Sequence, residues 1–262
     1  MSLASPAARR RWHSTSFPAL ALAAIVPLAA ASEPPPAAMA ELLQQSDVAE
    51  QQPASFRARI LLQGPGEARV EIEVWREGPS RTLVRFLGAT HRGKYLLYLE
   101  GGVFFLAPGA RAPVKLPPTF RLHGSATLDH VLGLRYSRDY EVALAALSED
   151  GAYVVFELTA RDAKAQYPLV RYVVARAARR PTRAELRLKG GKLATSVEFV
   201  AWAPNVPLRP QILLVRDHLR GGAETRVELL GLSERKPPEG LFSLSDGTAR
   251  RRLEEQEPVN GP

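Results

Sequence analysis

The sequence predicts a mainly β protein built on one meandering, curved antiparallel sheet. Between Ala68 and Leu232, short segments alternate apolar and polar residues, as strands with one buried face do. Turn-forming pairs such as Gly101-Gly102 and Gly190-Gly191 separate these segments. Strands joined by turns this short must be antiparallel neighbours, because a parallel pair needs a crossover of about a dozen residues or more.

Residues 1–31 are typical of an export signal. Three arginines, Arg9 to Arg11, precede the apolar stretch Phe17–Leu28, and small residues follow at Ala29–Ser32. The apolar stretch is shorter than the roughly 20 residues that span a membrane. A buried helix of the mature fold is the alternative, and the paired arginines leave the general and the twin-arginine export routes both open. We expect cleavage near Ser32 and a mature protein in the periplasm.

Composition narrows the possible partners of the mature chain. The sequence has no Cys, so we expect neither a disulfide nor the acylated Cys that anchors a bacterial lipoprotein. The formal net charge is +8, but the basic residues are scattered through the strands, which argues against a nucleic-acid site. Weak attraction to anionic membrane surfaces is more plausible for an exported protein. We therefore expect a soluble protein that does not bind nucleic acid.

Residues 32–53 are expected to form a spacer and one helix. The spacer Glu33–Pro36 is rich in proline, and Ala37–Gln52 contains good helix formers with apolar residues at helical spacing. Pro53 ends this helix. Residues 54–246 then form the β domain, and the polar residues 247–262 are expected to be a disordered tail.

The β domain contains a train of strand segments divided by glycine and proline turns. The expected strands are Phe56–Leu62, Arg69–Arg76, Arg81–Leu87, Lys94–Leu99, Val103–Ala107, Tyr136–Leu144, Ala152–Ala160, Leu169–Arg176, Arg183–Lys189, Leu193–Ala201, Pro210–His218 and Glu224–Leu232.

The alternation assigns one set of apolar residues to a shared inner face. A sheet of about ten strands tends to curl, and its interior is either filled by side chains or left as a ligand cavity. A filled core is the default, and both remain open. If a cavity exists, its walls are expected to be Val70, Ile72, Val74, Val84, Phe86, Val154, Phe156, Leu158, Val170, Tyr172, Val174, Leu186, Leu188, Val197, Phe199, Val227 and Leu229.

Two strands lack a polar face. Tyr95–Leu99 and Val103–Ala107 are apolar on both sides, so another element must cover their outer side. The helix expected at residues 37–52 is the obvious cover.

The residues from Arg81 to Val142 resemble the outer-membrane lipoprotein-sorting protein family, relatives of the periplasmic lipoprotein carriers LolA and LolB. The order of segments carries this resemblance, which covers residues 56 to 246. The matching segments are Phe86-Leu87, Arg92-Gly93, Leu96-Leu97, Val103–Pro108, Arg111–Pro118, Gly124, Thr127–Leu134, Ser137–Tyr140, Tyr167–Arg171, Asp217–Arg220 and Leu241–Leu244.

The resemblance implies an incomplete β-barrel wrapped over an N-terminal helix and a short lid-like helix, with an apolar cavity that shields acyl chains. The implied function is a periplasmic carrier of lipoprotein acyl chains or free lipid for outer-membrane sorting. A membrane transporter and an outer-membrane acceptor are its candidate partners. The alternative is a non-catalytic interaction module with a filled core that docks on a membrane-protein partner.

No residue constellation indicates catalysis. Gly124-Ser125 lacks the second glycine of a nucleophile elbow, although Asp129 and His130 are near in sequence. The histidines at 13, 91, 123, 130 and 218 show no metal-ligand spacing, and Asp217-His218 is typical of a solvated pair. We expect no enzyme, no cofactor and no metal. Two glycine-containing segments, Gly88–Arg92 and Leu122–Leu134, are either a gate at the cavity mouth or ordinary connections.

Overall fold

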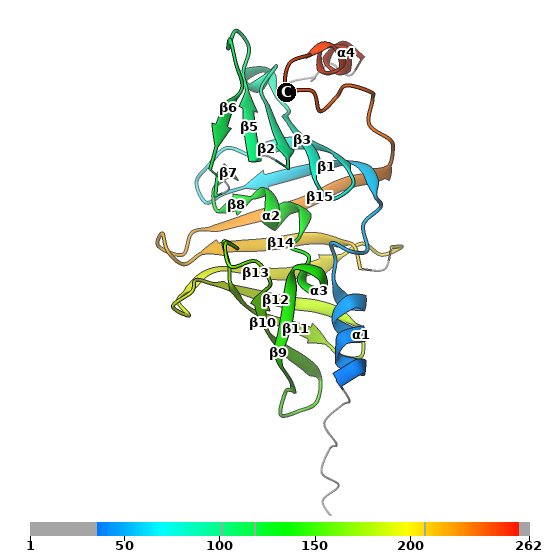
Figure 1. Ribbon diagram of the computed structural model, residues 1–262, viewed down its shortest axis with the longest axis vertical. Helices are drawn as coiled ribbons and strands as arrows, with labels where there is room; N and C mark the ends of the chain where they lie inside the picture. Colours follow the sequence, from blue (N-terminus) through cyan, green and yellow to red (C-terminus); the bar gives the residue numbers. More distant parts are fainter. Residues whose placement is uncertain (1–35, 101, 118, 207, 257–262) are drawn as a thin grey trace, which may run out of the picture. The chain divides into compact units, whose positions relative to one another are not determined.

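The structure is a computed structural model that describes residues 36–100, 102–117, 119–206 and 208–256. A thirteen-stranded antiparallel sheet is its main element (Figure 1). The expected export signal lies outside these residues. The strand order is β6-β5-β4-β3-β2-β1-β15-β14-β13-β12-β11-β10-β9. The sheet is curved and not closed, since β6 and β9 are its two edges. This confirms the expected fold class.

Two meanders make up this sheet. The first contains β1 (Ser55–Gln63), β2 (Val70–Glu77), β3 (Arg81–Phe86), β4 (Tyr95–Leu99), β5 (Gly102–Leu106) and β6 (Val114–Leu116). The second contains β9 (Tyr140–Leu147), β10 (Tyr153–Ala160), β11 (Leu169–Ala175), β12 (Arg180–Arg187), β13 (Leu193–Trp202), β14 (Pro210–Asp217) and β15 (Glu224–Glu234). Antiparallel pairing of β1 with β15 joins them, with Ile60 opposite Leu229 and Leu62 opposite Val227.

Short elements lie over the inner face of the sheet. These are the helices α1 (Pro36–Ser46), α2 (Leu128–Leu132) and α3 (Tyr136–Asp139), and a small sheet of β7 (Arg121–His123) and β8 (Ala126–Thr127). One 3₁₀ turn, η1 (Ala89–His91), connects β3 to β4. Met39 and Leu43 of α1 and Leu128 of α2 are buried in the same core as the strands. None of the helices described is long and apolar enough to cross a membrane.

The structure places every residue expected on the inner face in this one core. Twelve of the seventeen are buried, and Val70, Phe86, Leu188, Phe199 and Leu229 pack against them with partial exposure. The two-residue period of a strand explains this agreement, because alternate side chains of each strand must share a face.

The element that covers the outer side of β4 is different from the one expected. Helix α4 (Thr248–Gln256) lies there, in a second apolar cluster that includes Tyr95, Leu97 and Leu253. The helix at the N-terminus cannot do this, because its apolar residues pack in the inner core and the Tyr172 hydroxyl donates to the carbonyl of Ser46 at its end, 2.8 Å away. The expectation that the helix at 37–52 is the cover is therefore wrong.

We expected a disordered tail over residues 247–262. This expectation is wrong for residues 248–256, which form helix α4, and residues 257–262 lie outside the described part of the chain. Helix α4 is polar, but its residues Arg250, Leu253 and Glu254 are buried. Nη1 of Arg250 donates to the carbonyl of Leu241 at 3.1 Å, and the Tyr95 hydroxyl donates to Glu254 at 2.7 Å. Buried charges with hydrogen-bond partners hold this helix on the sheet, and composition alone does not reveal them.

The strand expected over Tyr136–Leu144 begins later than the sequence indicates. Residues Tyr136–Asp139 form α3, and β9 starts at Tyr140. Asp47 stabilises this turn of helix, because its carboxylate accepts bonds from the Ser137 amide at 2.7 Å and the Ser137 hydroxyl at 2.9 Å.

Candidate functional site

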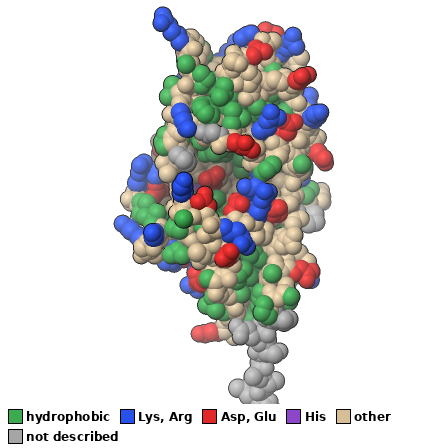
Figure 2. Space-filling view, in the orientation of Figure 1, with side chains coloured by type: hydrophobic (Ala, Val, Ile, Leu, Met, Phe, Trp, Pro, Cys, Tyr) green, Lys and Arg blue, Asp and Glu red, His purple; other side chains and the backbone are tan. Residues whose placement is uncertain are grey.

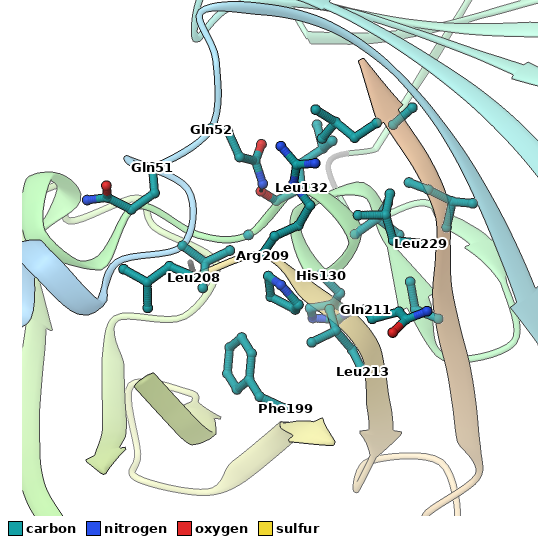
Figure 3. A pocket seen from close by; sticks show the side chains of 18 of the residues that line it. Gln51, Gln52, His130, Leu132, Phe199, Leu208, Arg209, Gln211, Leu213 and Leu229 are labelled. Atoms are coloured by element: carbon teal, nitrogen blue, oxygen red, sulfur yellow. Dashed lines mark hydrogen bonds between the residues drawn. The ribbon is translucent and has the colours of Figure 1, made fainter. Parts of the chain in front are cut away.

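An apolar cleft lies between the inner face of the sheet and the segment that covers it (Figure 3). It contains about 980 Å³ of empty space when its open mouth is included. Its residues are Val48, Gln51, Gln52, Pro53, Phe56, Ala58, Ile60, Asp129, His130, Val131, Leu132, Gly133, Leu134, Tyr136, Val197, Phe199, Val206, Leu208, Arg209, Pro210, Gln211, Leu213, Val227, Leu229 and Leu232.

Four of the expected cavity residues line this cleft: Val197, Phe199, Val227 and Leu229. The other thirteen are elsewhere in the core, where residues such as Phe156 and Tyr172 have no exposed surface. The sequence left open whether the interior is a filled core or a cavity, and the structure contains both, in different regions. The interior is filled under most strands and open between β1, β13, β14 and β15.

Several lining residues were not expected from the sequence. Phe56, Ala58 and Ile60 alternate along β1 and carry the same period-two signal as the residues that were chosen. Val206 and Leu208 come from the proline-rich loop between β13 and β14, where no periodic signal exists. These two residues of the loop thus form part of the cleft wall.

We call residues 121–134 the covering segment. It is attached to the sheet at the β14–β15 hairpin: the Ser125 amide donates to the Thr225 hydroxyl at 2.7 Å, and the Ser125 hydroxyl donates to the carbonyl of Ala223 at 2.7 Å. Arg121 forms an ion pair with Asp217. Gly124 has a φ of 50°, and a side chain there would collide with the Thr225 hydroxyl, so only glycine fits this close approach.

His130 is a neutral core residue. Burial lowers the pKa of His130 to about 4, and its Nδ1 accepts a hydrogen bond from the Thr127 amide at 3.2 Å. Its Nε2 lies 3.4 Å from the Tyr167 hydroxyl. The Ser125 hydroxyl donates to a backbone carbonyl, and these hydrogen bonds together organise the covering segment.

Polar groups occur at a few points of the apolar wall. Gln52 donates to the carbonyl of Leu132 at 3.0 Å and accepts a bond from Arg76 at 3.4 Å, which links the chain after α1 to the covering segment. Asp129 is half-buried, and burial raises its pKa while the positive charges of Arg135 and Arg76 oppose this rise. Figure 3 shows Gln51, Gln52, Arg209 and Gln211 among the apolar side chains.

Metal ligation has no evident place in this site. Within residues 36–256, apart from the three undescribed positions, no group of three or more His, Asp and Glu side chains is arranged to hold a metal ion. The cleft can exclude water from an apolar ligand, and its few polar groups can fix the ligand's orientation.

The fold is thus an open, curved antiparallel sheet with short helices on its inner side and an apolar cleft beneath them. No protein-family model and no curated protein sequence matches this chain. Solved structures do match it. A LolA superfamily protein from Nitrosomonas europaea aligns with a TM-score of 0.65 and 22% identity, over 78% of this chain and 96% of that one.

Two further structures show the same fold. A domain described as an outer membrane lipoprotein-sorting protein, from Vibrio parahaemolyticus, has a TM-score of 0.60 and 14% identity over 78% of this chain and 95% of its own. A DUF1329 family protein from Desulfovibrio piger has a TM-score of 0.63 and 14% identity over 80% of this chain and 97% of its own. This protein therefore has the LolA-like fold that its sequence resembles.

Proposed function

We propose that this protein is an exported, non-catalytic carrier that holds acyl chains of lipoproteins, or of other lipids, in the cleft. The observation that carries the proposal is the open apolar space between β1, β13, β14, β15 and the covering segment. Each CH₂ group removed from water contributes about 0.8 kcal/mol to binding. A dry cleft can therefore hold an acyl chain without a charged contact, and the LolA-like fold supports this use.

The proposed location is the periplasm. The Arg-led apolar segment at residues 9–28 supports export, and the lack of Cys supports a soluble rather than a lipid-anchored protein. A carrier in this place would receive its cargo from a membrane transporter and deliver it to an outer-membrane acceptor, which is the role in lipoprotein sorting that we propose.

Purification from the native host tests the proposal. We expect lipid extraction and mass spectrometry to recover lipid in near-stoichiometric amount from the mature protein, and we expect the stripped protein to bind a lipophilic dye that acyl chains displace. A lipid-free protein that binds neither dye nor acyl chains would instead support the alternative, an interaction module that docks on a membrane-protein partner.

A further inference from the structure

Arg209 places a positive charge on the wall of the apolar cleft. It is half-buried, and it has no ion pair with any other residue in the described part of the chain. Burial of an unpaired charge beside apolar surface is unfavourable. A structural role for the guanidinium group is therefore not apparent, whereas a role in ligand recognition would explain its position.

The backbone holds Arg209 in this position. The carbonyl of Arg209 accepts a bond from the Ala203 amide at 2.9 Å, and the next residue, Pro210, pairs with Trp202 where β14 begins. Leu208, just before it, has a φ of 57°, a left-handed conformation that is uncommon and strained for residues other than glycine. The loop thus accepts strain while it presents Arg209 to the cleft.

The surrounding charges favour an anion rather than a cation. Asp129 is the one acidic residue that lines the cleft within the described residues, and the positive charges of Arg135 and Arg76 act on it. Burial lowers the pKa of Arg76, and the charge of Arg135 lowers it further, so these two arginines repel each other. Nη1 of Arg135 is buried without a hydrogen-bond partner. Acidic and basic side chains both border a hollow on this face (Figure 2).

We infer that the ligand of this cleft is an anionic amphiphile, and that Arg209 binds its acidic headgroup while the apolar walls hold its chain. The inference rests on the proposed carrier function and names the cargo class. Guanidinium groups bind carboxylate and phosphate oxygens in bidentate geometry. Gln211 and Gln51, which also line the cleft, offer neutral hydrogen-bond donors beside such a group. A neutral acyl chain would leave Arg209 unpaired.

Dye displacement from the mature protein tests this inference with ligands of one chain length. Palmitate carries a carboxylate, hexadecyl phosphate carries a phosphate, and hexadecanol is neutral. All are used below their micelle concentrations, and inorganic phosphate alone is the headgroup without a chain. We expect the anionic ligands to bind about tenfold more tightly than hexadecanol or better, as one charge-assisted hydrogen bond implies. Added salt should reduce this preference.

The variant Arg209→Gln should lose the preference for anions, so that palmitate and hexadecyl phosphate bind to it no more tightly than hexadecanol does. Arg209→Lys should retain part of it. Arg171→Gln is the matched control, because Arg171 is exposed on β11, faces Glu157 at 3.6 Å and carries the same charge. This control should keep the full preference.

The outcomes separate the two proposals. If no ligand displaces the dye, the carrier function fails. If all three chain ligands bind equally, the carrier function stands and the anionic cargo is refuted. A preference for anions that survives in Arg209→Gln would refute the role of Arg209. If inorganic phosphate competes as well as hexadecyl phosphate does, the site binds the anion without any contribution from the chain, and the inference of an amphiphilic ligand is refuted.

Discussion

Phe156 and Phe199 both lie on the inner side of the sheet, but they should respond differently to truncation. Phe156 has no exposed surface and lies in the filled core. Phe156→Ala should lower the free energy of unfolding by about 3–5 kcal/mol, the cost of a buried cavity. Phe199 is half-buried at the cleft and stacks on Trp202 with ring centroids 5.8 Å apart. Truncation of Phe199 enlarges a space that already exists. Phe199→Ala should therefore lose only part of the free energy of burying the ring, together with the ring contact, which lowers the free energy of unfolding by about 1–2 kcal/mol in total.

Binding should show the reverse order. Phe199→Ala should weaken dye and acyl-chain binding about tenfold, because a lost apolar contact of roughly 1.4 kcal/mol has this effect, while Phe156→Ala should leave the affinity of the folded fraction nearly unchanged. Denaturant unfolding gives the first quantity and dye titration gives the second. Equal losses of stability in the two variants, or unchanged binding in Phe199→Ala, would refute our division of the interior into a filled part and an open part.

Three further outcomes are expected. Hydrogen exchange at Leu122–Leu134 should change when an acyl ligand saturates the protein, and unchanged protection would make this segment a plain connection and not a gate. Burial raises the pKa of Asp47 from 3.8 to about 6, so its contribution to stability is complete below pH 3.8 and is lost as the pH rises through 6. Burial lowers the pKa of His130 to about 4, so the contribution of His130 to stability rises with pH over the same range. The effect of Asp47 is therefore isolated by comparing the free energy of unfolding of Asp47→Asn with that of the natural protein at each pH. Relative to the natural protein, the variant should be more stable at pH 7 than at pH 4, and a difference that does not change with pH would contradict the raised pKa of Asp47. Leu253→Asp should detach α4 and lower the melting temperature without changing acyl-chain affinity, since Leu253 belongs to the outer cluster, and a variant that melts normally would show that α4 contributes little.

The faces of the strands could be predicted from the sequence, and the cleft could not. In β13, alternation places Val197 and Phe199 on the inner side, because every second residue of a strand must point the same way. Whether the space above them is filled depends on how far the covering segment stands from the sheet. That distance is set by non-local contacts such as Ser125 with Thr225, which no local pattern encodes.

The C-terminal helix illustrates a second limit. Over Thr248–Gln256, Leu253 is the only large apolar residue, so the helix lacks an apolar stripe of several residues. The helix is held instead by Arg250 and Glu254, whose partners Leu241 and Tyr95 are known only once the chain is folded. Charged residues are normally exposed, and a sequence rich in them therefore suggests a solvated tail.

The pairing of β1 with β15 constrains the order in which the protein can fold. The chain emerges from a ribosome or a translocation pore with its N-terminus first, so β1 appears early. One edge of β1 pairs with β2, but its other edge pairs with β15, the last strand of the sheet in the sequence. Contacts between such distant segments form slowly. Until residue 234 has emerged, β1 keeps one open edge and the two meanders remain separate, so a nascent chain needs protection from aggregation at β1 for nearly the whole of its synthesis.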